Sequence, residues 1–360
     1  MLFLAKIVKT TKEIIQKALD LGFSLVGIAD ASPLPTDYIE HIKGWLDAGY
    51  AGQMTWMLKN LEKRVNPACL LPGARSVIVV GLNYKPRPDD GEQMTDDGRP
   101  GFANGLCRGG QKAEDPASPM GYAEAGRRQK TGRVAAYARY EDYHPFIKKQ
   151  LRKLVNFLMS TSGPGLKFKI CVDSSPLLER ALAERAGLGF IGKNHMLINP
   201  TFGPQLFLGE IITNIDLVPR VTSHQSPDTN CGSCDKCIAA CPTGALRPDG
   251  RFDATKCISY LTIESNAEIP SDLAPKIGRR LFGCSECLLA CPYQQRAPSC
   301  SNSQFAYYPD RAQLNLNDIL NLTEDQFQNR FANSPILRPG LSRLKHVAGI
   351  CLENFSHRDI

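Results

Sequence analysis

Residues 231–242 read CGSCDKCIAACP, which places cysteines at Cys231, Cys234, Cys237 and Cys241 and a proline at Pro242. This C-x2-C-x2-C-x3-C-P spacing is typical of bacterial two-cluster ferredoxins. The first three thiolates can each bind an iron of one cubane, whereas the fourth cysteine binds the neighbouring cluster. The proline ends the helix that carries the cysteines. The segment therefore predicts a module that binds two [4Fe–4S] clusters.

A second run at residues 284–292, CSECLLACP, has the same ending but one cysteine fewer, and the missing position falls at Leu281. Two clusters need eight thiolates, and the two runs supply seven. Cys257, between the runs, is the expected eighth ligand, and Cys300 is the competing candidate. One cluster is then expected on Cys231, Cys234, Cys237 and Cys291, and the other on Cys241, Cys257, Cys284 and Cys287.

Zinc is the alternative ion for such cysteines. Structural zinc sites usually pair two C-x2-C units across a longer gap, so a tight triplet and two C-x3-C-P endings fit zinc poorly. Disulfides are also disfavoured, because a chain without an export signal stays in a reducing compartment. The scattered cysteines are expected to be packing residues: Cys69, Cys107, Cys171 and Cys351.

Composition sets broad limits on the chain. Its 360 residues are 42% hydrophobic and carry a formal net charge of +7. That charge permits a polyanionic partner without requiring one. No apolar run is long enough to cross a bilayer. The opening residues 1–22 are interrupted by Lys6 and continue as an amphipathic helix without a cleavage site, so we expect a cytoplasmic protein.

Hydrophobic periodicity predicts a fold of the α/β or α+β class with three parts. Helices are expected at 11–21, 38–61, 145–159 and 177–186, and strands at 24–29, 76–82, 168–173 and 205–213. Residues 85–133 are dense in Gly, Pro, Asp and Arg, which predicts a long surface loop. We expect an α/β domain over 1–225, a ferredoxin-like two-cluster domain over 226–300 and a short helical tail over 301–360.

Asp173 stands between a predicted strand and a predicted helix, which is where α/β folds often bind ligands. Ser175 is expected to cap that helix, Pro176 to occupy its first turn and Gly187 to end it. A capping aspartate has a lowered pKa. A proton donor would instead need burial against an apolar surface, which raises the pKa.

The roles of several other polar residues remain open. Residues 142–144, Asp-Tyr-His, resemble the Asp-x-His-x-x-Gly box of some cobalamin enzymes, but Ile147 replaces the glycine and excludes that box. His144 is a possible second acid, although a lone histidine is more often structural. No glycine-rich nucleotide fingerprint is visible. Four basic residues are candidate RNA contacts or simply solvated charges: Arg139, Lys193, Arg279 and Arg280.

The block Val172–Asn194, VDSSPLLERALAERAGLGFIGKN, resembles the epoxyqueuosine reductase family. Four further blocks resemble the same family at matching order and spacing: residues 141–144, 207–214, 257–264 and 277–284. The resemblance covers about residues 64–292 and is specific. It implies reduction of the epoxide of epoxyqueuosine to queuosine at the wobble position of tRNA, with release of water.

The resemblance also implies cofactors, partners and site residues. Cobalamin is expected base-off between the α/β domain and the clusters, which reduce its cobalt, and Asp173 matches the proton donor. The implied partners are a tRNA anticodon loop and an electron donor such as a flavodoxin or ferredoxin, with a monomeric chain. Besides Asp173, the expected cobalamin contacts are Arg64, Ala135, Leu197 and Leu208 on the α/β side and Tyr260, Ser285 and Glu286 near the clusters.

Two departures from the family and two other function classes stay open. Residues 85–133 form a longer loop than the family predicts. The chain ends soon after residues 341–350, where many relatives continue into helical repeats that touch tRNA, so a reduced RNA-binding surface is expected. A cobalamin-dependent reductive dehalogenase is one alternative, although such enzymes are usually exported. An electron-transfer protein is the other, but it would need neither Asp173 nor the large first domain.

Overall fold

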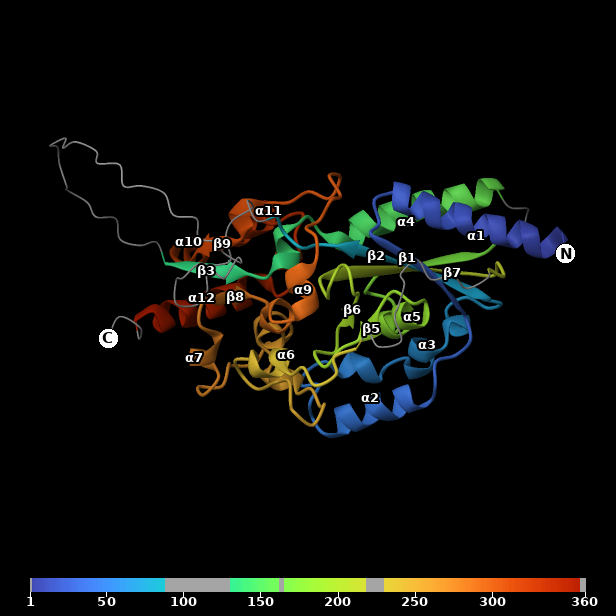
Figure 1. The fold of residues 1–360 in the computed structure, drawn as a ribbon. Coiled ribbons are helices and arrows are strands. Elements are labelled where there is room, and N and C mark those ends of the chain that lie inside the picture. Colours follow the sequence, from blue (N-terminus) through green and yellow to red (C-terminus); the bar gives the residue numbers. More distant parts are fainter. Residues whose placement is uncertain (1, 88–129, 162–164, 218–229, 357–360) are drawn as a thin grey trace, which may run out of the picture.

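The computed structural model describes residues 2–87, 130–161, 165–217 and 230–356, with the side chains of residues 2–10 left out. It contains two bodies side by side (Figure 1). One is built on a four-stranded sheet, and the other on a three-stranded sheet with the cysteine-rich segment. Among the described residues, no helix combines the length and the apolar character that crossing a membrane requires.

The larger sheet contains β1 (Leu25–Asp30), β2 (Ser76–Asn83), β4 (Phe168–Cys171) and β7 (Leu206–Thr213). Their order is β1-β2-β7-β4, and every neighbouring pair is antiparallel. All residues of the central strands β2 and β7 are buried. This body is therefore an antiparallel α+β arrangement and not the parallel sheet of a doubly wound α/β fold.

Helices cover both faces of this sheet (Figure 1). On one face lie α1 (Leu2–Asp20) and α4 (Tyr143–Thr161). The other face packs against α5 (Glu179–Arg185), with α2 (Asp37–Asp47) and α3 (Leu61–Val65) beyond it. Alternate residues of β7 divide between the two faces, because side chains along a strand point to opposite sides.

Two helices differ from the sequence prediction. The helix expected over 38–61 ends at Asp47, since Gly49 and Gly52 adopt positive φ angles of 73° and 55° that a helix cannot contain. A 3-10 turn and α3 follow. The helix expected from Leu177 begins at Glu179 and has no side-chain cap, so Ser175 and Pro176 lie outside it and their predicted capping roles are wrong. The stop at Gly187 is confirmed, with φ of 74°.

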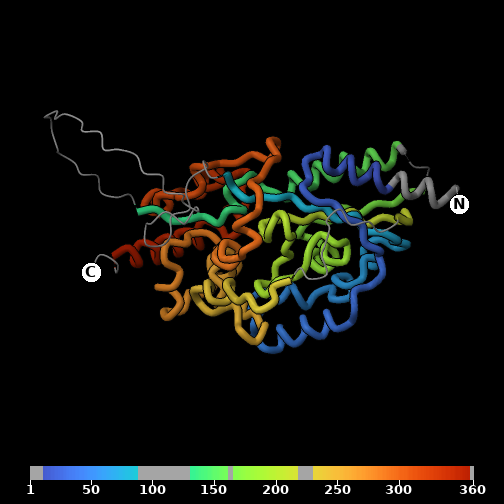
Figure 2. Tube along the Cα trace, in the orientation of Figure 1, coloured from blue at the N-terminus to red at the C-terminus, as the bar shows by residue number. Residues whose placement is uncertain are grey.

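The second body is built on three short strands from distant parts of the chain. β3 (Thr131–Val134) lies between β8 (Arg280–Phe282), which is parallel to it, and β9 (Gln313–Asn315), which is antiparallel. Figure 2 shows the three segments side by side. α10 (Leu316–Asn321) and α12 (Gly340–Ser356) complete its hydrophobic core.

This core corrects two predicted boundaries. The predicted tail over 301–360 is not separate over its described residues 301–356, because β9, α10 and α12 belong to the same core as the cluster-binding segment. The predicted loop over 85–133 ends in a strand at Thr131, while residues 88–129 lie outside the described part of the chain.

The remaining elements are η1 (Thr55–Leu58), η2 (Pro67–Cys69), η4 (Ala136–Arg139), β5 (Phe190–Ile191), β6 (Leu197–Ile198), α6 (Lys236–Ala239), η5 (Ala254–Lys256), η6 (Tyr260–Glu264), α7 (Ala274–Ile277), α8 (Glu286–Leu289), α9 (Pro292–Arg296), η7 (Pro309–Arg311), α11 (Glu324–Arg330) and η8 (Pro335–Leu337).

Hydrogen bonds hold the two bodies together. Lys85 Nζ, at the end of β2, donates to the carbonyl oxygens of Gln294 and Ala297 at 3.1 and 2.5 Å, at the end of α9. The Tyr260 hydroxyl accepts from the Gln53 N–H at 2.8 Å. These contacts fix the cysteine-rich body against the C-terminal end of β2 and against the segment that follows α2.

Candidate functional site

Four cysteines line one cavity of about 220 Å³ beside Lys193 and Tyr293. They come from two places, since α6 carries Cys237 and α8 ends just before Cys291. The Lys193 N–H donates to Cys231 Sγ at 3.5 Å, which is the kind of bond that tunes a cluster ligand. The four thiols are Cys231, Cys234, Cys237 and Cys291.

A second set of thiols lies near the first, since Cys237 of the first set is among the neighbours of Cys287. Burial raises the pKa of the Cys287 thiol, and the neighbouring thiols of Cys284, Cys257 and Cys241 raise it further. Burial likewise raises the pKa of Cys284 to about 12. Thiols this buried become ligands only when a metal centre takes the place of their protons.

The helices around these thiols follow the predicted pattern. α6 ends before Cys241-Pro242, and α8 ends before Cys291-Pro292. In the described parts of the chain, no three His, Cys, Asp or Glu side chains lie close enough together to hold a single ion. A cubane spreads its four ligands around a wider body, so a cavity lined by four thiols is the arrangement that it needs.

Cys300 lies elsewhere, in the hydrophobic core of the larger sheet with Tyr140 and Phe305. Leu281, which replaces the missing cysteine, is fully buried in β8. Cys171 and Cys351 are also buried in hydrophobic cores, whereas Cys69 is exposed. Cys107 lies outside the described residues.

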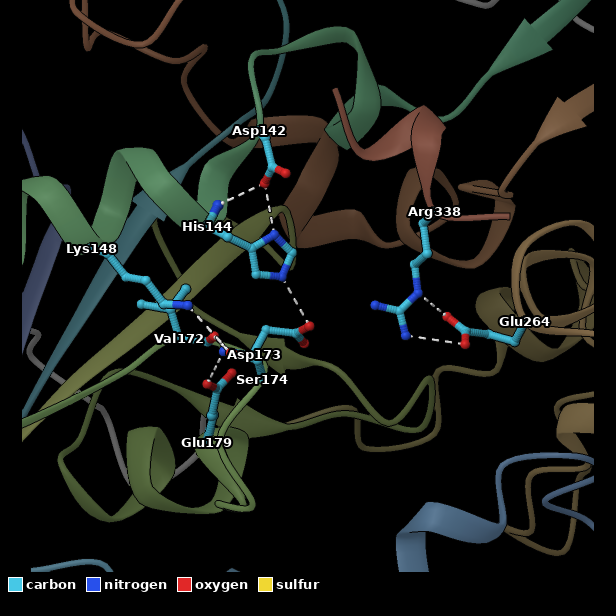
Figure 3. Close-up of polar contacts among 9 residues, drawn as sticks. All are labelled: Asp142, His144, Lys148, Val172, Asp173, Ser174, Glu179, Glu264 and Arg338. Atoms are coloured by element: carbon cyan, nitrogen blue, oxygen red, sulfur yellow. Dashed lines mark hydrogen bonds and ion pairs between the residues drawn. The ribbon is translucent and has the colours of Figure 1, made fainter. Parts of the chain in front are cut away.

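Asp173 lies on the loop that joins β4 to α5, and its side chain is 48% exposed. Its φ of 53° is in the left-handed region, which a non-glycine residue adopts only when its surroundings hold it there. The Asp173 N–H donates to Glu179 Oε1 at 2.5 Å (Figure 3). The loop is therefore held by the first residue of the helix that follows it.

His144, at the start of α4, joins two carboxylates (Figure 3). Its Nδ1 lies 2.7 Å from Asp142 Oδ1, and its Nε2 lies 3.1 Å from Asp173 Oδ2. Burial alone would lower the pKa of His144, but the hydrogen bonds to Asp142 and Asp173 outweigh it and raise the pKa to about 9. The imidazole is therefore protonated at neutral pH.

The hydrogen bond from His144 also lowers the pKa of Asp173, against the opposing effect of burial. Arg338 and Arg180 lower it further through their charges. At rest, the proton of this pair is thus held by the imidazole and not by the carboxyl group. Transfer along the Nε2–Oδ2 hydrogen bond would produce a neutral Asp173 beside a neutral imidazole.

Basic side chains surround Asp173. Arg338 lies across from His144 and Asp173 in Figure 3, and it donates to both oxygens of Glu264 at 2.7 and 3.1 Å. Lys148 Nζ donates to Ser174 Oγ at 3.3 Å. Arg180 follows Glu179 on α5; burial lowers the pKa of Arg180, and the charges of Glu179 and Asp173 act against this shift. Arg180 also donates to the His195 carbonyl at 2.8 Å, and the neighbouring Asn194 donates to the carbonyl of Cys287 at 3.4 Å, so this segment lies between the acid site and the second set of thiols.

The expected cobalamin contacts fall into separate groups. Ala135, Ser285 and Glu286 line one pocket together with Gly283. Glu286 is already paired with Arg133 and Arg280, at 3.0 and 2.7 Å. The other four are spread over three places: Leu197 and Leu208 in the core beneath α5, Arg64 on α3, and Tyr260 in the core of the second body.

Two of the candidate RNA contacts are unsuited to that role. Arg139 is buried and donates through Nε to the Val134 carbonyl. Arg280 is buried in its pairing with Glu286. Lys193 is exposed, although its Nζ donates to the Gly232 carbonyl at 2.9 Å. Arg279 lies over the ring of Phe355.

Sequence reasoning misses three residues of the acid site: Glu179, Glu210 and Arg338. Glu210 leaves one visible signal, because it is the only charged residue in the apolar run QLFLGEIIT over 205–213. A carboxyl in a central strand needs a partner or a proton. Arg338 leaves no signal, since only the folding of the second body brings it near Asp173.

Two sets of thiols beside a carboxylate–imidazole site define the class of protein, an iron–sulfur oxidoreductase. Comparison with known proteins specifies the family. A model described as "4Fe-4S double cluster binding domain" matches residues 230–294, and one described as "Epoxyqueuosine reductase QueG, DUF1730" matches residues 116–174. The epoxyqueuosine reductase of Francisella cf. novicida (strain Fx1) is 36% identical over 326 residues, which cover 89% of this chain and 80% of that protein.

Solved structures agree with the sequence match. A crystal structure of epoxyqueuosine reductase with an epoxyqueuosine-modified tRNA-Tyr stem loop has a TM-score of 0.80 at 29% identity, and the match covers 97% of this chain and 82% of that one. An epoxyqueuosine reductase from Bacillus subtilis, whose catalytic aspartate loop is swung out of the active site, has a TM-score of 0.80 at 27% identity, with 98% and 83% covered. The chain belongs to the epoxyqueuosine reductase family. Membership in this family rules against the two alternatives, a reductive dehalogenase and an electron-transfer protein.

Proposed function

We propose that this chain reduces epoxyqueuosine to queuosine at the wobble position of tRNA. The reaction consumes two electrons and two protons, and it releases the epoxide oxygen as water. The observation that carries the proposal is the acid pair of His144 and Asp173, whose loop leads into α5. Arg180 of that helix donates to the His195 carbonyl, and the neighbouring Asn194 donates to the carbonyl of Cys287. A proton source and an electron source then meet at one site.

The clusters deliver the electrons. We assign Cys231, Cys234, Cys237 and Cys291 to the first cluster, since these four thiols line one cavity. Cys257 completes the second set because its thiol neighbours Cys241, Cys284 and Cys287, whereas Cys300 lies in another core. A flavodoxin or ferredoxin is the proposed external donor.

The residues present also fit cobalamin. Arg64 Nε is buried without a hydrogen-bond partner in the described structure, so it is available to a polar group of the corrin. Gly283, with φ of 69°, lets the backbone pass close to Ala135 at this pocket, since a Cβ at Gly283 would lie 2.9 Å from the Cβ of Ala135. Ala135 and Ser285 would contact the cofactor, with Glu286 held behind them by its arginines. When bound, cobalamin supplies a low-valent cobalt nucleophile for opening the epoxide.

His144 and Asp173 provide one of the two protons. His144 holds it at neutral pH, and its hydrogen bond to Asp142 fixes the ring so that Nε2 faces Asp173. Asp173 then donates the proton to the epoxide oxygen as the carbon–oxygen bond breaks. Displacement of solvent by substrate would raise the pKa of the exposed Asp173 carboxyl and favour transfer from His144.

The RNA is proposed to dock over this site through its anticodon loop. Unpaired bases can be turned out of a loop and inserted into a pocket. Lys148, Arg180 and Arg338 surround Asp173 and are placed to meet flanking phosphates. The stem-loop complex of a structural relative supports this mode of binding.

Nucleoside analysis of tRNA from cells that lack this protein tests the proposal. We expect epoxyqueuosine to accumulate and queuosine to disappear, and the wild-type gene to restore queuosine. The Asp173→Ala gene should restore almost none, provided that its product is present at the wild-type level. Normal queuosine in the deletion strain would overturn the assignment if no second gene supplies the activity.

A further inference from the structure

Glu210 occupies the middle of β7 and is completely buried. Its Cα partners on the neighbouring strands are Val79 and Cys171. Leu208 and Ile212, two residues away on either side, belong to the apolar core beneath α5, so Glu210 faces that core. An isolated carboxylate in such a place is strongly unfavourable unless it binds a proton or pairs with a partner.

The group that meets Glu210 is another carboxyl. Glu179, at the start of α5, contacts it side chain to side chain. In the described structure, neither Glu210 oxygen has a donor among nitrogen or hydroxyl groups. Two ionised carboxylates are acceptors only, so a hydrogen bond between them requires that one carries a proton. Glu179 also accepts the N–H of Asp173 through Oε1.

We infer that Glu179 and Glu210 share one proton and that Glu179 is thereby held as the positioning residue of the Asp173 loop. The inference rests on the proposed role of Asp173 and extends it. The Asp173 N–H bond offsets the strained left-handed conformation at that residue. Glu210, from beneath, prevents Glu179 from turning away. Neither carboxyl touches the substrate in this scheme.

The surrounding charges agree with a shared proton. Burial, followed by the charge of Asp173, raises the pKa of Glu179 to about 7, although the hydrogen bonds with the Asp173 N–H and with Glu210, and then the charge of Arg180, act in the opposite direction. Burial raises the pKa of Glu210 well above its usual range, and Glu179, Cys171 and Asp173 add to this. The pair therefore keeps one proton above neutral pH, and it binds a second proton only as pH falls below about 7.

Infrared spectroscopy tests the shared proton without any substrate. At pH 8, exposed carboxyls are ionised, so a C=O band of a protonated carboxylic acid comes from buried groups. We expect this band in the difference spectrum between the wild type and E210Q, and also between the wild type and E179Q. Each amide can donate to the remaining carboxylate, so both variants should keep full iron content. Absence of the band from both difference spectra would overturn the inference.

Hydrogen exchange tests the positioning. In Glu179→Ala, the Asp173 amide loses its acceptor, and its exchange should accelerate at least about tenfold. Glu179→Gln should restore slow exchange, because its amide oxygen can accept the same N–H. Glu184→Ala is a matched control on α5, since Glu184 accepts the Ile191 N–H at 2.8 Å. That variant should speed exchange at Ile191 and leave Asp173 unchanged.

Turnover should follow the exchange result. Glu179→Ala is expected to lower the single-turnover rate at least about tenfold, with Glu179→Gln partly rescued and Glu184→Ala unaffected. The ratio of E210Q to wild-type rates should rise as pH falls below 7, because only the wild-type pair gains a second proton there. Unchanged exchange at Asp173 in Glu179→Ala would contradict the positioning role. The infrared and exchange measurements need no substrate, so they test this inference even if the protein is inactive on tRNA. Failure of the proposed function can therefore be distinguished from failure of the inference about Glu179 and Glu210.

Discussion

The proposed cluster ligands all come from one stretch of chain between Cys231 and Cys291, whereas the groups around Asp173 come from several distant segments. His144 begins α4, Glu210 lies in β7, and Arg338 precedes α12. Short loops and two small helices are enough to gather thiols, because the metal itself organises them. The acid site depends on strand register and on the docking of two bodies.

Substitutions in the two regions should therefore have different effects on the protein. Loss of a proposed ligand thiol should remove a cluster, because Cys300, the competing candidate, lies in another core. Loss of an acid-site residue should leave the protein folded, with its clusters and cobalamin bound, but should change proton delivery. The predictions below separate these two kinds of failure, beginning with the largest effect.

Cys257→Ala should remove one cluster. Wild-type protein reconstituted without oxygen should bind about eight irons per chain, the content of two [4Fe–4S] clusters, and the variant about half of that. Conversion of epoxyqueuosine should fall below detection, because the electron path is broken. Cys300→Ala is the matched control and should keep full iron content. Iron loss in Cys300→Ala with retention in Cys257→Ala would reverse the ligand assignment.

Asp173→Ala should keep both clusters and cobalamin yet convert epoxyqueuosine-containing tRNA at least about a hundredfold more slowly, the usual contribution of a positioned acid. The measurement is the single-turnover rate at saturating RNA, with iron and corrin content determined on the same sample. A rate equal to that of the wild type would remove Asp173 from the mechanism.

His144→Gln should lower the rate about tenfold at neutral pH, since the proton reserve is lost while Asp173 remains. In the wild type, the rate should fall as pH rises through about 9, where His144 loses its proton. The same ionisation affects stability. The His144 pKa is raised above its unfolded value near 6.5, so its stabilising contribution is complete below about 6.5 and is lost as pH rises through about 9. A pH profile of His144→Gln that still breaks near 9 would exclude this role.

Lys148→Ala should have the smallest effect, a several-fold weaker binding of a stem loop. The slope of log Kd against log salt should decrease by about 0.7, the value for one phosphate contact with a single strand. Lys149→Ala, an exposed neighbour on the same helix, should change both quantities less. Equal effects of the two substitutions would indicate general attraction to the positive surface.

Much of the cluster module could be predicted from the sequence because its chemistry is local. Spacing identifies the thiols, and the prolines after Cys241 and Cys291 mark where the short helices have ended. The acid site could be predicted only at Asp173. Glu179 could not be predicted as its partner, because the helix begins at Glu179 and not at Leu177, where the sequence predicts it. The predicted domain boundary at residue 301 is wrong for a similar reason, because β9 pairs with β3, a strand far from it in the sequence.

Reoxidation of the clusters on addition of substrate tests the link between the two regions most directly. Fully reduced, cobalamin-loaded protein is mixed without oxygen with a stem loop carrying epoxyqueuosine, and cluster absorption and queuosine are followed together. We predict that the wild type releases two electrons for each queuosine formed. In Asp173→Ala, the clusters should stay reduced while the RNA is bound. Reoxidation at the wild-type rate in that variant, or queuosine formation without cluster oxidation, would contradict the account.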